Sequence, residues 1–186
     1  TVMKLIILDR DGVINYESRA YIKSPDEWIP IPGSIEAIAE LTAAGYTIVV
    51  ATNQSGVARG YINLSILETI HAKLLNEVEK HQGKINKIYF CPHGPHDGCN
   101  CRKPKPGMFE QIATDLQVVL SDLPAIFVGD SLRDVELGLA TGCKFFLVTG
   151  PGGDGAETLE LLSTAQRQQI TIVDDLADAT SRLLYA

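Results

Sequence analysis

The strongest constraint on this chain is a short apolar run that ends in two acidic residues. Residues 5–8 read Leu-Ile-Ile-Leu, and they are followed by Asp9, Asp11 and Gly12. An unbroken apolar run of this length predicts a strand that is buried on both faces. Two carboxylates at the end of such a strand raise each other's pKa unless a cation lies between them, and Mg²⁺ prefers oxygen ligands. The alternative is an ordinary β-turn, because Asp and Gly are common turn residues.

Composition restricts the class of protein. The chain has 186 residues and a net charge of −7, so we expect one domain over residues 1–186 and no nucleic-acid partner. It contains no apolar run close to the roughly 20 residues that span a membrane, and its N-terminus lacks the pattern of a signal peptide. We therefore predict a cytoplasmic protein with no membrane partner. A monomer is expected because no coiled-coil pattern or apolar surface helix is evident.

Strand and helix patterns alternate along the whole chain. Ser34 is the predicted cap of the first helix, and Ser65 with Glu68 suggests a capping box for the second. Alternation of this kind predicts an α/β fold with a Rossmann-like, doubly wound parallel sheet, whose ligands bind where the strands end. The later strands are predicted at residues 46–51, 85–90, 125–128, 145–148 and 170–173, and the later helices near residues 65–78, 109–116, 133–141 and 159–166 and at the C-terminus.

Polar and charged residues follow four of the predicted strands. In a parallel sheet these four loops lie at the same edge, so acids, a hydroxyl group and cations are expected to converge there. A phosphoryl group needs this combination, because its transfer requires a nucleophile, charge neutralisation and fixed donors. The residues concerned are Asp9 and Asp11, Thr52 and Asn53, Arg102 and Lys103, and Asp130 with Asp134.

Each of these residues has a possible role in phosphoryl transfer. Asp9 is the candidate nucleophile, since a carboxylate can attack phosphorus and form an acyl phosphate. Asp11 is positioned to protonate the leaving oxygen and then to activate water. Asp9 and Asp130 are candidate Mg²⁺ ligands, and Thr52 and Lys103 are candidates to hold the phosphoryl oxygens. Structural alternatives are a turn at Thr52 and a helix cap at Asp130.

A loop rich in cysteine, proline and glycine separates the third strand from Arg102. Three thiols and an imidazole form a closed four-ligand set of the kind that holds structural Zn²⁺, with His93 and His96 as alternative imidazoles. The other interpretation is a reduced loop without metal. Because Arg102 and Lys103 follow the last cysteine, we hypothesise that zinc fixes these two cations towards the substrate. The cysteines in this loop, at about residues 91–101, are Cys91, Cys99 and Cys101.

Four motifs carry a family resemblance. In order along the chain they are DRDGV, ATNQSG, CRKPKPGM and GDSLRD. Together they resemble the haloacid dehalogenase superfamily of aspartate-nucleophile phosphatases over about residues 4–150. The longer strings TNQSGVARG and CRKPKPGM resemble one subfamily, the D-glycero-D-manno-heptose 1,7-bisphosphate 7-phosphatases. The histidinol-phosphate phosphatases are similar to it and share much of the pattern.

The resemblance implies a role for individual residues. Asp9 would be the nucleophile and Asp11 the acid/base, which is the phosphatase form of the motif. The implied Mg²⁺ ligands are Asp9, Asp11 through its backbone carbonyl, and Asp130. The implied structural Zn²⁺ ligands are Cys91, His93, Cys99 and Cys101. The residues implied to touch substrate or phosphoryl group are Glu17, Ser18, Arg19, Ala20, Thr52, Asn53, Gln54, Ser55, Arg102 and Lys103. Ser131 stands where some relatives carry Lys, and Lys105 is a second choice for the phosphate lysine.

The implied activity is Mg²⁺-dependent removal of the 7-phosphate of D-glycero-D-manno-heptose 1,7-bisphosphate through an aspartyl phosphate. This reaction would serve ADP-heptose and lipopolysaccharide core synthesis or a related heptose pathway. One alternative is the same chemistry on histidinol phosphate. Another class is a phospho-accepting receiver domain, although its accepting Asp lies on a later strand. Only about 24 residues separate Asp9 from Ser34, so no large cap domain is expected and small loops would select the substrate. Trp28 is either one of the substrate-selecting residues or a packing residue.

Overall fold

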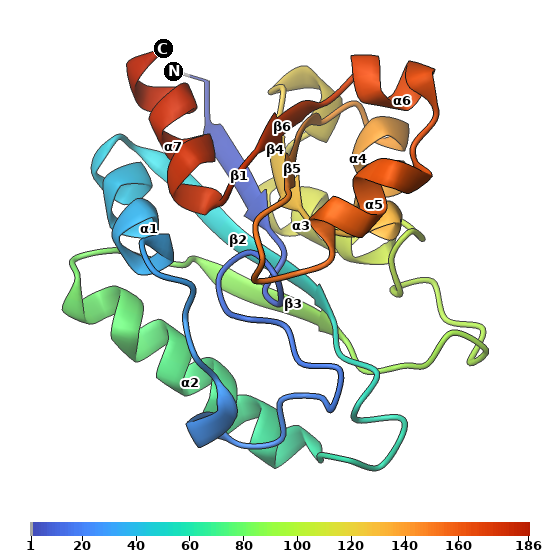
Figure 1. The fold of residues 1–186 in the computed structure, drawn as a ribbon. Coiled ribbons are helices and arrows are strands. Elements are labelled where there is room, and N and C mark those ends of the chain that lie inside the picture. The colour runs from blue at the N-terminus through green and yellow to red at the C-terminus, as the bar shows by residue number, and fades with distance from the viewer. Residues whose placement is uncertain (1) are drawn as a thin grey trace.

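The computed structural model describes residues 2–186, and its central feature is one six-stranded sheet (Figure 1). Every neighbouring pair of strands is parallel, in the order β3-β2-β1-β4-β5-β6. This order confirms the predicted Rossmann-like, doubly wound sheet. The strands are β1 (Lys4–Leu8), β2 (Tyr46–Asn53), β3 (Lys87–Cys91), β4 (Ile126–Gly129), β5 (Lys144–Val148) and β6 (Thr171–Val173).

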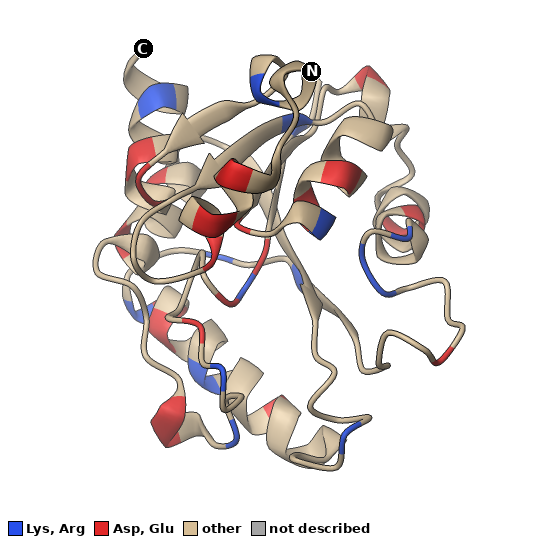
Figure 2. Ribbon diagram, turned by 45° about the vertical axis from the view of Figure 1, so that its right-hand side comes forward, with Lys and Arg blue, Asp and Glu red and all other residues tan. Residues whose placement is uncertain are grey.

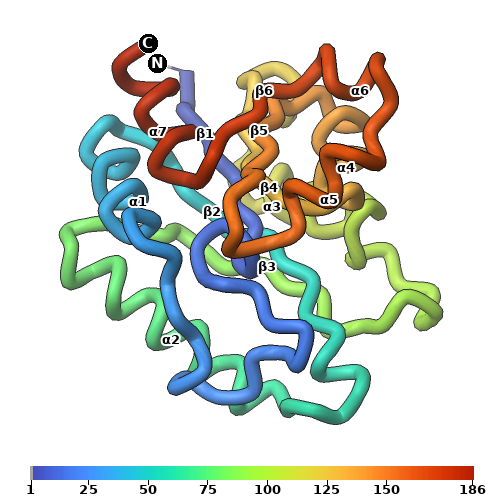
Figure 3. Tube along the Cα trace, in the orientation of Figure 1, coloured from blue at the N-terminus to red at the C-terminus, as the bar shows by residue number. Residues whose placement is uncertain are grey.

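Helices cover both faces of the sheet, as the chain trace in Figure 3 also shows. On one face lie α1 (Ser34–Ala43), α2 (Leu64–Lys80) and α7 (Leu176–Tyr185). On the other lie α3 (Gly107–Leu116), α4 (Leu132–Ala140) and α5 (Gly155–Leu161), with α6 (Thr164–Gln168) following α5. Two 3₁₀ turns, at Pro25–Glu27 and Leu120–Asp122, complete the regular structure. Among the described helices, none combines the length and apolar character that a bilayer crossing requires.

The apolar run of β1 joins the two halves of the core. Leu5 and Ile7 pack among the side chains on the α3 and α4 face, while Ile6 and Leu8 pack on the α1 and α2 face. All four are at most 1% exposed, which confirms the predicted burial on both faces. Burying each such side chain contributes roughly 1.5–3 kcal/mol, so the loop that carries Asp9 and Asp11 starts from a firmly held strand.

Two predicted helix caps are wrong. The cap of α1 is Gly33, at φ 86°, and Ser34 is the first helical residue. The Ser34 hydroxyl instead donates to a backbone carbonyl in the loop after β1, at 2.7 Å, and so ties that loop to the helix. The cap of α2 is Asn63, whose side chain accepts a backbone N–H in the first turn, so Ser65 and Glu68 lie inside the helix. The two corrections have different causes, because Asn63 supplies a side-chain cap to α2, whereas Gly33 supplies none and the Ser34 hydroxyl is used by the loop after β1.

Two element boundaries also differ from the prediction. The helix expected over residues 159–166 is two short helices, because the chain leaves helical geometry at Leu162 and restarts after the Ser163 cap. The second strand continues to Asn53, so Thr52 and Asn53 lie on β2 and pair with β3. Sheet hydrogen bonds therefore fix the backbone from which these two polar side chains project.

The strand order reverses between β1 and β4, and this point defines the candidate site. The chain passes from β3 at one edge of the sheet to β4 beside β1, so the loops after β1 and β4 diverge on opposite sides. Ligands of open α/β sheets bind in the resulting crevice. Residues 9–33 and 92–106 surround it, and within them the only regular helix is the 3₁₀ turn at Pro25–Glu27. The described chain therefore has no large cap domain, as predicted.

Candidate active site

A small cavity of about 60 Å³ lies at this crevice. Figure 2 shows acidic and basic residues meeting where the strands end. The cavity brings together residues from the end of β2, from the loops after β1, β3, β4 and β5, and from the first turn of α4. Its lining comprises Asp9, Asp11, Glu17, Thr52, Asn53, Lys103, Asp130, Ser131, Arg133 and Asp154.

Lys103 lies between two buried acids. Its Nζ is 3.1 Å from Oδ1 of Asp9 and 2.8 Å from Oδ1 of Asp134, and it donates to the backbone carbonyl of Ala51 at 2.8 Å. Burial would lower the pKa of Lys103, but the charges of Asp134 and Asp9 outweigh burial and raise it. Asp134 also accepts backbone N–H groups at the start of α4, in a capping box with Ser131. Asp134 therefore contacts Lys103 directly and restricts the position of its ammonium group.

Asp130 is a second buried carboxylate in the cavity, and no cationic side chain pairs with it among the described residues. Burial, followed by the charge of Asp134, raises the pKa of Asp130 to about 8. The glycines at residues 12 and 153 lie against this carboxylate, and a Cβ at either position would overlap it. Gly12 also has φ 85°, a backbone conformation that favours glycine. The carboxylate oxygens of Asp9, Asp130 and Asp134 lie within 4.8 Å of one another.

Glu17 and Asp154 add further negative charge beside Asp130, again within 4.8 Å. Partial burial, together with the neighbouring Asp154 carboxylate, raises the pKa of Glu17 to about 8. The backbone N–H of Asp154 donates to Oδ2 of Asp130 at 2.8 Å. Asp154 was missed in the sequence, although it follows β5 and the rule that placed the other loops at this edge applies to it as well. With one lysine shared among so many acids, the cavity has the donors and the excess negative charge that suit Mg²⁺.

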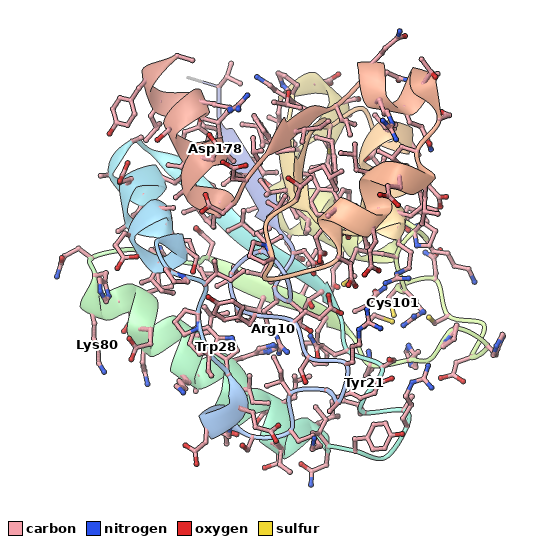
Figure 4. All side chains as sticks on the ribbon, in the orientation of Figure 1. Arg10, Tyr21, Trp28, Lys80, Cys101 and Asp178 are labelled. Atoms are coloured by element: carbon pink, nitrogen blue, oxygen red, sulfur yellow. The ribbon has the colours of Figure 1, made fainter. Side chains whose placement is uncertain are left out.

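The Asp11 side chain faces a different set of partners from Asp9. Its Oδ1 receives Nε and Nη2 of Arg10, both at 2.8 Å, and Nδ2 of Asn15 at 3.0 Å. Its Oδ2 receives Nε2 of Gln54 at 3.3 Å. Burial would raise the pKa of Asp11, but the charge of Arg10 and the hydrogen bonds to the carboxylate outweigh it and lower the pKa. Arg10, which is labelled in Figure 4, is fully buried. It also contacts His71 on α2, which was not expected from the sequence.

The polar residues at the end of β2 support the cavity in different ways. Thr52 is 1% exposed, and its hydroxyl accepts from Gln54 at 2.9 Å. The Asn53 amide exchanges two hydrogen bonds with the backbone of Lys103, at 3.0 and 3.2 Å. Asn53 therefore clamps the segment that carries the buried lysine. Lys105, the alternative lysine, bonds to the carbonyl of Cys99 at 2.9 Å and does not line the cavity.

The cysteine loop gathers its four candidate ligands, which include Cys101 (Figure 4). One atom from each of Cys91, His93, Cys99 and Cys101 lies within 4.8 Å of the others, and all four cysteines of the chain are free thiols. His93 offers Nδ1, at 3.3 Å from the Cys101 sulfur, whereas His96 is outside the group. Three thiols and an imidazole match the donor set of a structural zinc site.

The rim of the cavity is more exposed and more basic. A second cavity of about 290 Å³ adjoins the first and shares Lys103 and Arg133 with it. Arg102 also lines this second cavity, and its pKa is lowered by burial, then by the charges of Arg133 and Arg59. Trp28 is a packing residue, the second of the two roles expected for it, because it is 0% exposed and lies in the core. Six predicted substrate residues do not line the first cavity in the described structure, namely Ser18, Arg19, Ala20, Gln54, Ser55 and Arg102.

Comparisons with known proteins agree with this geometry. The HAD-hydrolase-like family model matches residues 100–179. A Pseudomonas putida protein named D-glycero-beta-D-manno-heptose-1,7-bisphosphate 7-phosphatase is 52% identical over 182 residues, which cover 98% of this chain and 100% of that protein. A Pseudomonas aeruginosa protein of the same name is 52% identical and covers 97% of each chain.

A solved structure is also similar over nearly the whole chain. It is the D,D-heptose 1,7-bisphosphate phosphatase from Bordetella bronchiseptica complexed with magnesium and phosphate, at a TM-score of 0.90 and 47% identity, covering 98% of both chains. This likeness and the two Pseudomonas relatives confirm the resemblance found in the four motifs. The chain belongs to the D-glycero-D-manno-heptose 1,7-bisphosphate 7-phosphatase family of haloacid dehalogenase-like hydrolases.

Proposed function

We propose that this protein is a Mg²⁺-dependent phosphatase that removes the 7-phosphate of D-glycero-D-manno-heptose 1,7-bisphosphate, in ADP-heptose, lipopolysaccharide core or related heptose synthesis. The observation that carries the proposal is the buried Asp9–Lys103–Asp134 group beside Asp130 at the reversal of strand order. The names of the Pseudomonas relatives specify the beta anomer, which makes this anomer the first substrate to test.

Asp9 is the proposed nucleophile. Its Oδ1 accepts the backbone N–H of Arg10 at 2.8 Å and lies 3.1 Å from Lys103, so the carboxylate is fixed in one orientation. Burial, followed by Asp134, raises the pKa of Asp9, and Lys103 only partly opposes the shift. The ionised nucleophile therefore needs a further cation, and the proposed ligands are Asp9, Asp130 and the backbone carbonyl of Asp11. Magnesium bound there supplies positive charge that keeps the carboxylates ionised and attracts phosphoryl oxygens.

Two steps at phosphorus complete the proposed reaction. An Asp9 oxygen forms a bond to phosphorus as the bond to the sugar oxygen breaks. Asp11 gives a proton to that oxygen, so this step requires the protonated form of Asp11, although Arg10 lowers the pKa of Asp11 in the free protein. Water then attacks the same phosphorus, Asp11 accepts its proton, and phosphate leaves as Asp9 is regenerated. Lys103 and the Thr52 hydroxyl, both nearly fully buried, hold the phosphoryl oxygens.

The rim supports a substrate with a second phosphate. None of the guanidinium groups of Arg59, Arg102 and Arg133 is ion-paired to an acid among the described residues, and the latter two line the adjoining cavity. Guanidinium groups bind phosphate through paired hydrogen bonds. Histidinol phosphate carries an ammonium group at its other end, which this basic rim would repel. The substrate contacts predicted for Glu17–Ala20 and for Asn53–Ser55 are part of the same proposal.

The remaining assignments are also proposals. Cys91, His93, Cys99 and Cys101 would hold Zn²⁺ without taking part in the chemistry, and their free thiols suit the reducing cytoplasm. We place the whole of residues 1–186 in one domain, and we expect a monomer with no nucleic-acid or membrane partner.

The test is phosphate release with Mg²⁺ from both anomers of heptose 1,7-bisphosphate and from histidinol phosphate. We expect the beta bisphosphate to be preferred by at least roughly tenfold, the scale of one charge-assisted contact. The control is Asp9→Asn, in which an amide replaces the nucleophile, and the rate should fall by at least roughly 10⁴-fold. A preference for histidinol phosphate would contradict the proposed substrate, and an active Asp9→Asn variant would contradict the mechanism.

A further inference from the structure

A fully buried arginine lies directly between the two candidate catalytic acids in the sequence. Arg10 is 0% exposed, and its backbone carbonyl accepts N–H groups from the following turn. Its side chain makes two 2.8 Å contacts with Oδ1 of Asp11. Its Nη1 lies 3.1 Å from Nε2 of His71, on α2. The guanidinium thus joins Asp11 to His71, which is 61 residues from Arg10 in the sequence.

These contacts make the two oxygens of Asp11 inequivalent. Oδ1 is occupied by two nitrogens of Arg10 and by the Asn15 amide, whereas Oδ2 receives only the longer bond from Gln54. A proton shuttle needs a free oxygen in a fixed direction, and Oδ2 is the one that can meet this need. Arg10 therefore restricts proton transfer to one oxygen of a carboxylate that lines the cavity.

His71 fixes the guanidinium in turn. Arginine has donors and no acceptor, so Nε2 of His71 accepts, and the imidazole is neutral with its proton on Nδ1. His71 is 8% exposed, and its ring packs beside Phe90, with 6.0 Å between ring centroids. Burial, followed by the charge of Arg10, lowers the pKa of His71 to about 3, in agreement with a neutral acceptor.

We propose that Arg10 and His71 are positioning residues that aim Oδ2 of Asp11 at the leaving oxygen of the substrate. The inference rests on the proposed function, because Asp11 needs aiming only if it transfers the proton. A buried ion pair adds little net stability compared with apolar residues of similar volume, so its main consequence here is the fixed carboxylate.

The distinguishing property is the leaving group. A sugar oxygen leaves poorly as an alkoxide and needs the proton from Asp11, whereas p-nitrophenolate leaves without protonation. Loss of aim should therefore slow the first chemical step on the sugar phosphate and spare that step on p-nitrophenyl phosphate. A change that only loosened the fold would slow both.

The experiment compares Arg10→Met, His71→Leu and His71→Gln with the unchanged protein. The quantity measured is the rate of leaving-group release in the first turnover, with Mg²⁺, from heptose 1,7-bisphosphate and from p-nitrophenyl phosphate. Arg10→Met and His71→Leu should lose roughly tenfold or more on the sugar substrate, a part of the 10²–10⁴-fold that general acid catalysis supplies. His71→Gln keeps an oxygen acceptor for Arg10 and should recover most of that rate.

The matched control is Leu74→Ala, which creates a cavity on the same helix, one turn from His71, where Leu74 is 0% exposed. It should affect both substrates equally. The inference would be overturned if His71→Leu slowed first-turnover release equally from the two substrates, or from neither. If Arg10→Met does not fold, the result for His71→Leu is decisive. An active Asp9→Asn variant would instead overturn the proposed function, so the two failures are distinguishable.

Discussion

The floor of the cavity and its rim are built in opposite ways. At the floor, the side chains of Lys103, Asp9 and Asp134 are 3%, 11% and 0% exposed, and each touches at least one of the others. At the rim, Arg19 meets Glu157 at 3.4 Å with both side chains more than 70% exposed. Charges interact strongly where water is excluded and weakly where it is not. The difference indicates that the floor is held by its own contacts before substrate arrives, whereas the rim is not.

Zinc removal should have the largest effect, because the cysteine loop leads into both the floor and the rim. Lys103 is clamped from β2 by Asn53, whereas Arg102 has only a 3.4 Å contact to the carbonyl of His93. Chelation should therefore raise KM for the bisphosphate by roughly 10–100-fold, the usual scale for lost support of a site, with a smaller fall in kcat. Steady-state kinetics with Mg²⁺ restored after chelation measures both constants.

A cysteine outside the loop provides the control for that measurement. Cys143 is buried near Thr141, so Cys143→Ser should leave KM unchanged where Cys101→Ser reproduces the effect of chelation. If chelation lowered kcat and left KM unchanged, the cysteine loop would be holding Lys103 at the floor. The floor would then depend on zinc, contrary to the comparison.

The second test uses pH and concerns His71, which contacts Arg10 behind the floor of the cavity. The pKa of His71 falls to about 3 on burial beside Arg10, from about 6.5 in the unfolded chain, although Asp11 opposes the shift. Between these values the unfolded chain binds a proton that the folded protein does not. The stability from neutral His71 is therefore complete above pH 6.5 and lost as pH falls towards 3.

Linkage gives the size of this effect. Lowering the pH from 7.5 to 5 should remove roughly 2 kcal/mol of unfolding free energy through His71 alone. His71→Gln should lack this component, so the difference in unfolding free energy between the two proteins should shrink by about that amount. Denaturant unfolding at both pH values measures it. A difference that did not change with pH would mean that His71 is protonated in the fold or exposed to water.

The residues at the floor were easier to predict from the sequence than the supports behind them, which are Arg10 and His71. Asp9, Thr52 and Asp130 could be found because each lies at the end of an apolar run, and parallel strands bring such ends together. The same rule, applied to the loop after β5, would have found Asp154.

The supports could not be predicted in this way. Arg10 has the sequence context of an exposed loop residue, and its burial depends on His71, a partner 61 residues away on a helix whose cap was itself assigned wrongly. The rim contacts of Arg19 and Ser55 stay predictions, because exposed side chains are not fixed by packing. Local patterns identify strand ends, while long-range polar contacts depend on the finished fold.

The third test moves to the rim. Arg133 lies in the first turn of α4 and lines both cavities. It has no ion-pair partner among the described residues. Arg133→Gln should raise KM for the bisphosphate by roughly tenfold, the scale of one charge-assisted hydrogen bond, and leave a monophosphate substrate unaffected. Arg182→Gln, on α7, is the matched control. An equal rise for both substrates would assign Arg133 to the transferred phosphate and not to a second one.

The smallest expected effect belongs to Arg19, which the family resemblance implicates in substrate binding. Its side chain is 88% exposed and points to Glu157, and an exposed pair of this kind contributes little. If the loop keeps this position, Arg19→Ala should change KM and kcat by no more than about twofold, the scale of a weak surface contact. A tenfold rise in KM would show that the loop turns onto the bound substrate. That outcome would correct the open position of residue 19 and would strengthen the contrast, because the rim would then change shape on binding while the floor would not.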